Sequence, residues 1–354
     1  MNKHGSICPL DSEVKAVEQA VSDIEGALKS ISDDILDENC KMMGEEQGKE
    51  VARDEKHRRL KGVMRVGAFA RSLMLRGECT VDLVLMCTGR PTAALFHDIA
   101  RRMPAKFEEL SSEVVYNVSQ EVGSAAILVI SQVEDHRVQV TLTLTSTEMR
   151  DKPSPELILA DQEAGVLHRP SCLAALAALR HTKWFQMVAQ GLPSCSILMR
   201  VLKDICRRVP AWGVLNSWIL ELLVQKSLTS ANPDYTRPGD VFRRVMECVA
   251  SGIFLPGGSG LQDPCEKGVA DASSLSAQER VNITLSAQHA LRLVAFGKAH
   301  LVLGVDPLPL PGAKREPATA GEKVRPEEGD KTGNETIAEP DAKRPRVAAE
   351  GTPE

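Results

Sequence analysis

Residues 77–85 read GECTVDLVL, and residues 138–145 read VQVTLTLT. In the second run apolar and polar residues alternate strictly, which is the pattern of a strand with one buried face. Shorter β-type runs occur at 81–86, 114–116 and 126–130, with a helix expected near 92–102. Residues 60–146 are therefore predicted to form a unit of mixed helices and strands.

Helices are predicted on both sides of this unit. Residues 11–35 carry valine, isoleucine and leucine at alternating steps of three and four, which indicates a helix that packs on the domain or forms a coiled-coil seam. Residues 63–75 are also predicted to be helical, and 153–170 to be a loop. Five further helices are expected, at 171–189 with Ser171 as its cap, 196–208, 216–228, 239–251 and 277–303, the last closed by Gly304.

The composition changes after Asp306. Prolines at 307, 309 and 311 form a stiff spacer, and the residues beyond are rich in Glu, Lys, Pro and Gly without an aromatic. Residues 307–354 are therefore predicted to be a disordered tail. Its basic cluster, Lys343-Arg344-Pro345-Arg346, is typical of a nuclear localisation signal, with an ordinary charged tail as the alternative.

Composition excludes several classes of function. The chain of 354 residues has a formal net charge of −5, which argues against binding nucleic acid by bulk charge. Its nine cysteines include no Cys-x-x-Cys pair, which favours reduced thiols in an intracellular protein over a disulfide framework or a zinc site. The sequence lacks an apolar run of the length that spans a membrane, so no membrane partner is expected.

One segment invites comparison with nucleotidyltransferases. These enzymes hold two Mg²⁺ ions with two acids at alternate positions of a strand and a third acid on a neighbouring strand. Here Gly67 suits the turn before the strand, but Asp82 is the only acid and Thr80 takes the alternate position. The polar face of 138–145 carries threonines at 141, 143 and 145 and no acid. We therefore predict no catalytic residue, no metal and no enzymatic activity.

Several segments resemble the DZF domain of the nuclear factor 90 family. They include CLAALAALRHTKWFQ at 172–186, VPAWG at 209–213, ASGIFLP at 250–256 and SAQHALR at 286–292. Together the matching segments span about residues 10–306, in order. The resemblance implies an α+β fold, with a nucleotidyltransferase-like mixed-sheet lobe at 10–165 and a helical dimerisation lobe at 166–306.

The same resemblance implies a function. It suggests a heterodimer with another DZF protein, such as nuclear factor 45, in nuclear complexes that bind RNA or regulate transcription. Double-stranded-RNA-binding domains and zinc fingers of the relatives are missing here, so RNA is expected to be reached mainly through the complex. Two alternatives are an active nucleotidyltransferase on RNA and a competitor that regulates full-length DZF RNA-binding proteins.

The layout also resembles that of the 2′-5′-oligoadenylate synthetases. That likeness implies that Lys203 corresponds to a triphosphate-binding lysine, and that Trp218 beside Ser217 corresponds to a base-stacking aromatic. With Gly67 and Asp82 they would hold a nucleoside triphosphate that is not turned over. The alternative is a solvated Lys203 and a core Trp218, and no cofactor is required.

A dimer surface is predicted in the Gly- and Pro-rich segment 252–265, because its large apolar residues need a partner surface or the core. The residues expected there are Ile253, Phe254, Leu255, Pro256, Leu261 and Asp263, together with Trp212 as an aromatic anchor. Packing inside the domain is the alternative for the apolar residues. Basic residues at 180, 181 and 183 are expected to form a solvated helix end rather than an RNA-binding patch.

Overall fold

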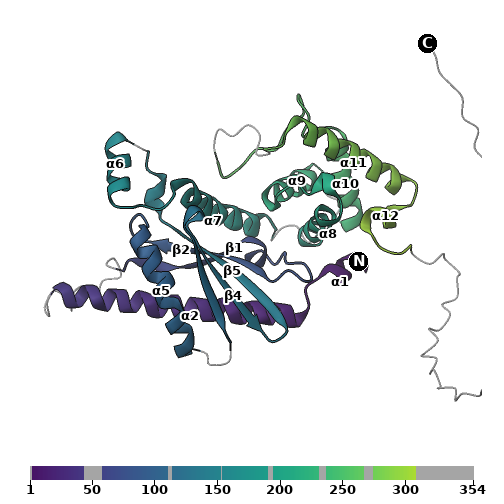
Figure 1. The fold of residues 1–354 in the computed structure, drawn as a ribbon. Coiled ribbons are helices and arrows are strands. Elements are labelled where there is room, and N and C mark those ends of the chain that lie inside the picture. Colours follow the sequence, from purple (N-terminus) through teal and green to yellow (C-terminus); the bar gives the residue numbers. More distant parts are fainter. Residues whose placement is uncertain are drawn as a thin grey trace, which may run out of the picture. The chain divides into compact units, whose positions relative to one another are not determined.

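A sheet of five strands organises the first half of the chain. The computed structural model describes residues 2–43, 58–110, 114–152, 154–189, 194–230, 237–266 and 274–307. The strands are β1 (Leu60–Val66), β2 (Thr80–Cys87), β3 (Tyr116–Glu121), β4 (Ala126–Val133) and β5 (His136–Thr145). Their order is β1-β2-β5-β4-β3, and β2 pairs parallel with β5 while the other neighbours are antiparallel. Figure 1 labels β1, β2, β4 and β5 of this sheet. The mixed sheet agrees with the predicted α+β class.

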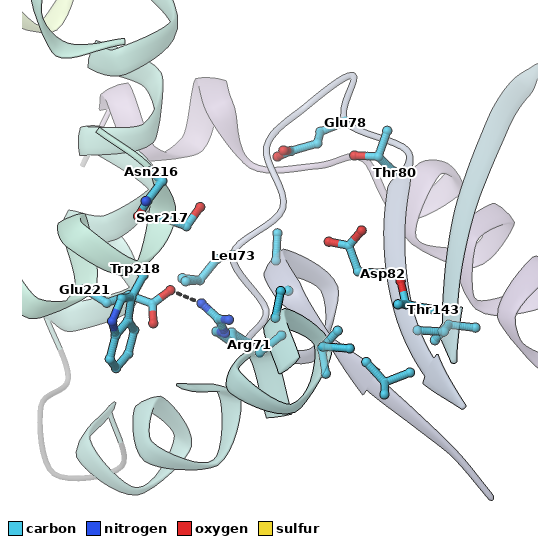
Figure 2. A pocket seen from close by; sticks show the side chains of 18 of the residues that line it. Arg71, Leu73, Glu78, Thr80, Asp82, Thr143, Asn216, Ser217, Trp218 and Glu221 are labelled. Carbon is cyan, nitrogen blue, oxygen red and sulfur yellow. Dashed lines mark hydrogen bonds and ion pairs between the residues drawn. The ribbon is translucent and has the colours of Figure 1, made fainter. Parts of the chain in front are cut away.

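Alternation along β2 divides its side chains between the two faces of the sheet. Val81 and Leu83 are buried at 1% and 0% exposure, whereas Thr80 and Asp82, which alternate with them, are exposed. Figure 2 shows Thr80 and Asp82 projecting from the same side of this strand. The periodicity that builds the core therefore also aims the one predicted strand acid away from it.

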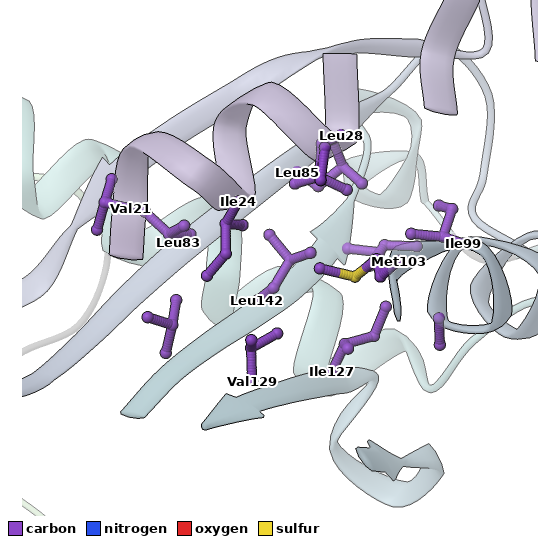
Figure 3. Packing of buried hydrophobic residues seen from close by; sticks show 14 of the residues in the cluster. Val21, Ile24, Leu28, Leu83, Leu85, Ile99, Met103, Ile127, Val129 and Leu142 are labelled. Carbon is purple, nitrogen blue, oxygen red and sulfur yellow. The ribbon is translucent and has the colours of Figure 1, made fainter. Parts of the chain in front are cut away.

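The core on the first face is covered by two helices, α2 (Asp11–Met43) and α5 (Ala93–Leu110). Ile24 and Leu28 of α2 pack with Ile99 of α5 over Leu83 and Leu142 of the sheet (Figure 3). The predicted apolar stripe of the first helix is thus buried within the domain. Helix packing, rather than a coiled-coil seam, is confirmed for this segment.

The opposite face of the sheet receives α7 (Arg169–Ala189). Ala175 of this helix packs against Val66 and Val84, and its small side chain lets the helix lie close to the strands. Farther along, Phe185 of the same helix is buried in a second core. A single helix therefore contributes to both cores.

The second core belongs to a helical lobe. Its elements are α8 (Cys195–Arg208), η4 (Pro210–Trp212), α9 (Ser217–Thr229), α10 (Pro238–Ala250), α11 (Ala277–Ala295) and α12 (Ala299–Leu303). Three residues from earlier in the chain join it: Ile7 of α1 (Asn2–Ile7), and Leu73 and Leu75 from the segment between β1 and β2. The helical lobe is therefore completed by residues that come before it in the sequence, on both sides of β1.

Three predictions of local structure were wrong. Residues 63–75 do not form one helix, because 60–66 pair with β2 as an edge strand and only α4 (Gly67–Ala70) is helical. The segment 153–170 contains α6 (Pro155–Glu163), whose N-cap Ser154 accepts from the Leu157 amide. The helix predicted at 277–303 is broken into α11 and α12 at Gly297, where φ is +72°.

Smaller differences concern element ends. The helix α7 starts at Arg169, and Ser171 donates to the Gly123 carbonyl instead of capping it. Gly304 closes α12 in the left-handed conformation, as predicted. Short 3₁₀ turns, η2 (Val122–Ser124) and η3 (Thr147–Arg150), flank β4 and β5. Among the described helices, none has the length and hydropathy needed to cross a membrane.

Candidate functional site

A cleft of about 620 Å³ lies between the exposed face of β2 and the start of α9. Every residue predicted to hold a nucleotide lines it: Gly67, Asp82, Lys203, Ser217 and Trp218. Asp82 comes from β2, Gly67 from the start of α4, just after β1, and the other three from the helical lobe. Figure 2 shows Asp82 on one side of the cleft and Ser217 and Trp218 on the other. Residues far apart in sequence are thus brought to one site, and the contacts of each decide what the cleft can bind.

Gly67 and Asp82 form the wall on the sheet side. Gly67 has φ +70°, and a Cβ added there would lie 2.6 Å from Oδ2 of Asp82. Glycine is required on both counts, because L side chains disfavour this conformation and the carboxylate occupies the space. Although Asp82 is exposed as a residue, the cleft removes part of the water around its carboxyl group, and this desolvation raises its pKa. The neighbouring wall positions are Thr80 and Thr143, so the strands present one acid to the cleft.

Lys203 of α8 is already paired. Its Nζ donates to the Leu73 carbonyl at 3.0 Å and contacts the two carboxylate oxygens of Glu78 at 3.3 and 3.0 Å. An ammonium group has three donors, and these contacts occupy them. Glu78 stands two residues before β2, outside the alternating positions that sequence reasoning considered, so it was missed. A phosphate would have to displace Glu78 to reach this lysine.

A buried ion pair crosses the floor of the cleft. Arg71, just after α4, donates through Nη1 to Oε1 of Glu221 on α9, and their side chains are 7% and 0% exposed (Figure 2). Burial raises the pKa of Glu221 to about 7, although Arg71 and Lys203 oppose that rise. No sequence signal marked this pair, because its members lie in different lobes. Because Arg71 is paired with Glu221, this second cation of the cleft is not free to bind a phosphate.

Trp218 stands at the start of α9, whose N-cap Asn216 accepts from the Ile219 amide. The ring of His181 is stacked on it, with centroids 3.7 Å apart and planes within 5°, and Trp184 meets it edge-on. Its Nε1 donates to Oδ2 of Asp263 at 3.0 Å. One face of the predicted base-stacking aromatic is therefore already covered by a protein side chain.

His181 and Arg180 do not form the solvated helix end that was predicted, whereas Lys183 is exposed, as predicted. Burial lowers the pKa of His181 to about 4, so its imidazole is neutral near pH 7. Arg180 is paired with Glu266. Both side chains contact the segment after α10, which fixes this part of α7 against the helical lobe.

The predicted dimer anchors require correction. Trp212, Ile253, Phe254 and Leu261 are between 0% and 6% exposed and pack inside the helical lobe's own core. The Trp212 Nε1 donates to Ser286 within the same lobe. These four are core residues, which was the alternative reading. Of the remaining predicted interface residues, Pro256 is exposed, while Leu255 and Asp263 are partly buried.

The predicted nuclear localisation residues, Lys343, Arg344, Pro345 and Arg346, lie outside the described part of the chain.

Within the described residues, the cleft offers carboxylates at Asp82, Glu78 and Glu221 against cations at Arg71 and Lys203. Two of those acids are neutralised by the two cations, and the third stands alone on the strands. With both cations paired and one carboxylate left on the strands, the charges of the cleft attract neither a triphosphate nor its two metal ions strongly.

Comparisons with known proteins match the chain to one family along most of its length. The model described as the DZF N-terminal domain matches residues 1–190, and that of the DZF C-terminal domain matches residues 194–321. Among solved structures, CdnC in complex with HORMA-deltaN from Escherichia coli MS115-1 is similar, with 13% identity and a TM-score of 0.51 over 84% of this chain and 91% of that one.

The Vibrio cholerae DncV cyclic AMP-GMP synthase is also similar, with 10% identity and a TM-score of 0.47 over 86% of this chain and 94% of that one. Identities this low concern the fold alone. The fold is that of a nucleotidyltransferase-like protein, as predicted.

Proposed function

Because this chain belongs to the DZF family, we propose that it is a pairing subunit with a nucleotidyltransferase-like fold and no nucleotidyl transfer activity. It binds a second DZF protein through its helical lobe. The resulting heterodimer acts in nuclear complexes that bind RNA or regulate transcription. The observation that carries this proposal is an apolar surface on the last two helices.

The outward face of α11 carries two large apolar side chains among exposed polar ones such as Asn282, Gln288 and Arg292. The inner face of α11 is buried in the lobe through Ile283, Ala287 and Ala290. Val281 and Leu285, half a turn away, are 42% and 58% exposed. Such side chains on a helix that already packs on its other face indicate a second contact surface.

Two more large apolar side chains are exposed past the end of α11. Phe296 is 75% exposed and Leu301 of α12 is 56% exposed. A groove of about 350 Å³ runs beside Leu301, between α11, α12 and α8. Exposed aromatic and aliphatic side chains beside a groove are the usual anchors of protein interfaces. This surface, defined by Val281, Leu285, Phe296 and Leu301, replaces the buried anchors that the sequence suggested.

Loss of catalysis is supported by the cleft. Two-metal transfer needs carboxylates that are free to bind both ions, and Asp82 is the only strand acid at hand. Glu78 is held by Lys203, and Glu221 by Arg71. With Mg²⁺, labelled nucleotides and RNA, we expect no incorporation by the purified chain. Incorporation that disappears in Asp82→Asn would instead establish the enzyme alternative.

The pairing test is light scattering coupled to size exclusion, with this chain and the DZF domain of nuclear factor 45 mixed. We expect a complex of one copy each that Leu285→Asp prevents. The matched control is Leu159→Asp on α6, because Leu159 and Leu285 are 59% and 58% exposed. A complex that survives Leu285→Asp combined with Phe296→Asp would refute this surface, and separate elution of the wild-type chains would refute the pairing.

A further inference from the structure

Three side chains with metal-binding atoms converge beside Trp218. They are His181 on α7, and Asp263 and Cys265 in the segment that follows α10. One ligand atom of each lies within 4.8 Å of the other two. Imidazole nitrogen, carboxylate oxygen and thiolate sulfur are the donors that zinc takes in proteins. The cluster therefore has the right chemistry for one zinc ion.

The separation of His181 and Asp263 supports shared ligation. Nε2 of His181 lies 3.6 Å from Oδ2 of Asp263, which is too long for a hydrogen bond. Among the described residues, this buried nitrogen has no hydrogen-bond partner. Two ligands bonded to one tetrahedral zinc ion at about 2.0–2.2 Å lie roughly 3.5 Å apart. The observed distance thus suits two ligands of one ion.

The surrounding contacts hold these donors in place. Asp263 accepts from Nε1 of Trp218 at 3.0 Å through Oδ2, and from the Cys265 amide at 2.7 Å through Oδ1. The His181 ring is fixed by its stacking on Trp218. Outer contacts of this kind orient the ligands of protein metal sites. The donors are therefore positioned by the fold rather than by chance exposure.

A second Cys–His pair, Cys8 and His4, differs from this cluster in the positive charge beside it. The Cys8 sulfur lies 3.5 Å from Nε2 of His4, but Arg200 is 3.1 Å from that nitrogen and 3.8 Å from the sulfur. A guanidinium there repels a cation. Beside His181 the guanidinium groups of Arg71 and Arg180 are instead paired with Glu221 and Glu266.

We propose that His181, Asp263 and Cys265 bind one Zn²⁺, with the fourth position left to water or an external ligand. As the sulfur–zinc bond forms, the Cys265 thiol releases its proton to solvent. The ion ties α7, which also packs on the sheet, to the segment after α10. Zinc occupancy therefore fixes the helical lobe against the sheet. The inference does not depend on the pairing function.

The test is titration of the metal-free chain with Co²⁺, whose bond to a thiolate gives a charge-transfer absorption band. We expect a band that saturates at about one equivalent and disappears when Zn²⁺ displaces the cobalt. Cys265→Ser removes the band, whereas the control Cys248→Ser, another partly buried cysteine of the same lobe, keeps it. Trp218→Phe weakens binding about 10–100-fold, because Asp263 loses its donor.

Two results would overturn the site. One is a wild-type chain that shows no thiolate band on titration. The other is a band that persists in Cys265→Ser, which would assign the sulfur to another cysteine. Circular dichroism establishes whether each variant is folded. If Cys265→Ser does not fold, His181→Gln decides, because it keeps the thiol and is expected to lose the saturable binding.

Discussion

Replacing Arg71 with methionine is expected to destabilise the folded chain strongly, because it leaves the buried carboxylate of Glu221 without its ion-pair partner. The Glu221 side chain is 0% exposed, and Arg71 is its ion-pair partner. Removing one member of a buried ion pair costs about 3–5 kcal/mol. Arg65→Met provides the control, since Arg65 and Glu25 are 46% and 32% exposed and such pairs contribute about 0–1 kcal/mol.

The pH dependence of this loss gives a sharper test. Burial raises the pKa of Glu221 from 4.5 to about 7 in the folded chain. A raised pKa means that the folded state binds the proton more tightly. The stability from this group is therefore complete below pH 4.5 and is lost as the pH rises to about 7. Above that pH the wild-type contribution levels off.

In Arg71→Met the pKa of Glu221 rises further, because Arg71 is the main group that lowers it. The variant should continue to lose about 1.4 kcal/mol per pH unit above pH 7. Urea unfolding at a series of pH values, followed by circular dichroism, measures this difference. The double variant Arg71→Met with Glu221→Leu should recover most of the loss and abolish the slope. A pH profile of Arg71→Met parallel to that of the wild type would refute the reasoning.

Three further predictions are each tested by thermal or urea unfolding. Gly67→Ala should cost at least about 1 kcal/mol more than Gly77→Ala, because both have positive φ but only the first brings a Cβ within 2.6 Å of Asp82; equal losses would contradict this. Ser276→Ala should cost about 1 kcal/mol, since it removes the capping box with Glu279 at the start of α11, and an unchanged midpoint would count against that cap. Phe254→Ala should cost about 3–5 kcal/mol and Pro256→Ala within about 0.5; the reverse order would restore Phe254 as a surface anchor.

Alternation made part of this fold predictable. The polar and apolar positions of β5 and the single acid of β2 follow from a period of two, which also places Asp82 on the cleft face. The same approach failed at β1. Leu60, Val63 and Val66 repeat every three residues, as in a helix, but pairing with β2 outweighs that local preference.

The contacts of the cleft could not be predicted in the same way. The bonds from Lys203 to Glu78 and from Arg71 to Glu221 join residues 125 and 150 positions apart. Neither acid stands in a motif, and Glu221 lies in an otherwise apolar run at 218–224. The segment at 253–261 was ambiguous because large apolar residues in a Gly-rich run suit a core and an interface equally. Only the tertiary packing of the helical lobe separates the two.

The entry of Ile7, Leu73 and Leu75 into the helical core has a consequence for dividing the molecule. The two family matches meet near residue 190, which suggests a place to cut the chain. A fragment ending there would expose these three side chains and Phe185 to water, while its complement would lack one wall of its interior. Each fragment alone would therefore be prone to aggregate, and the two expressed together should reassemble. Although the two family matches divide the sequence, we therefore expect the two segments to unfold together in one cooperative transition.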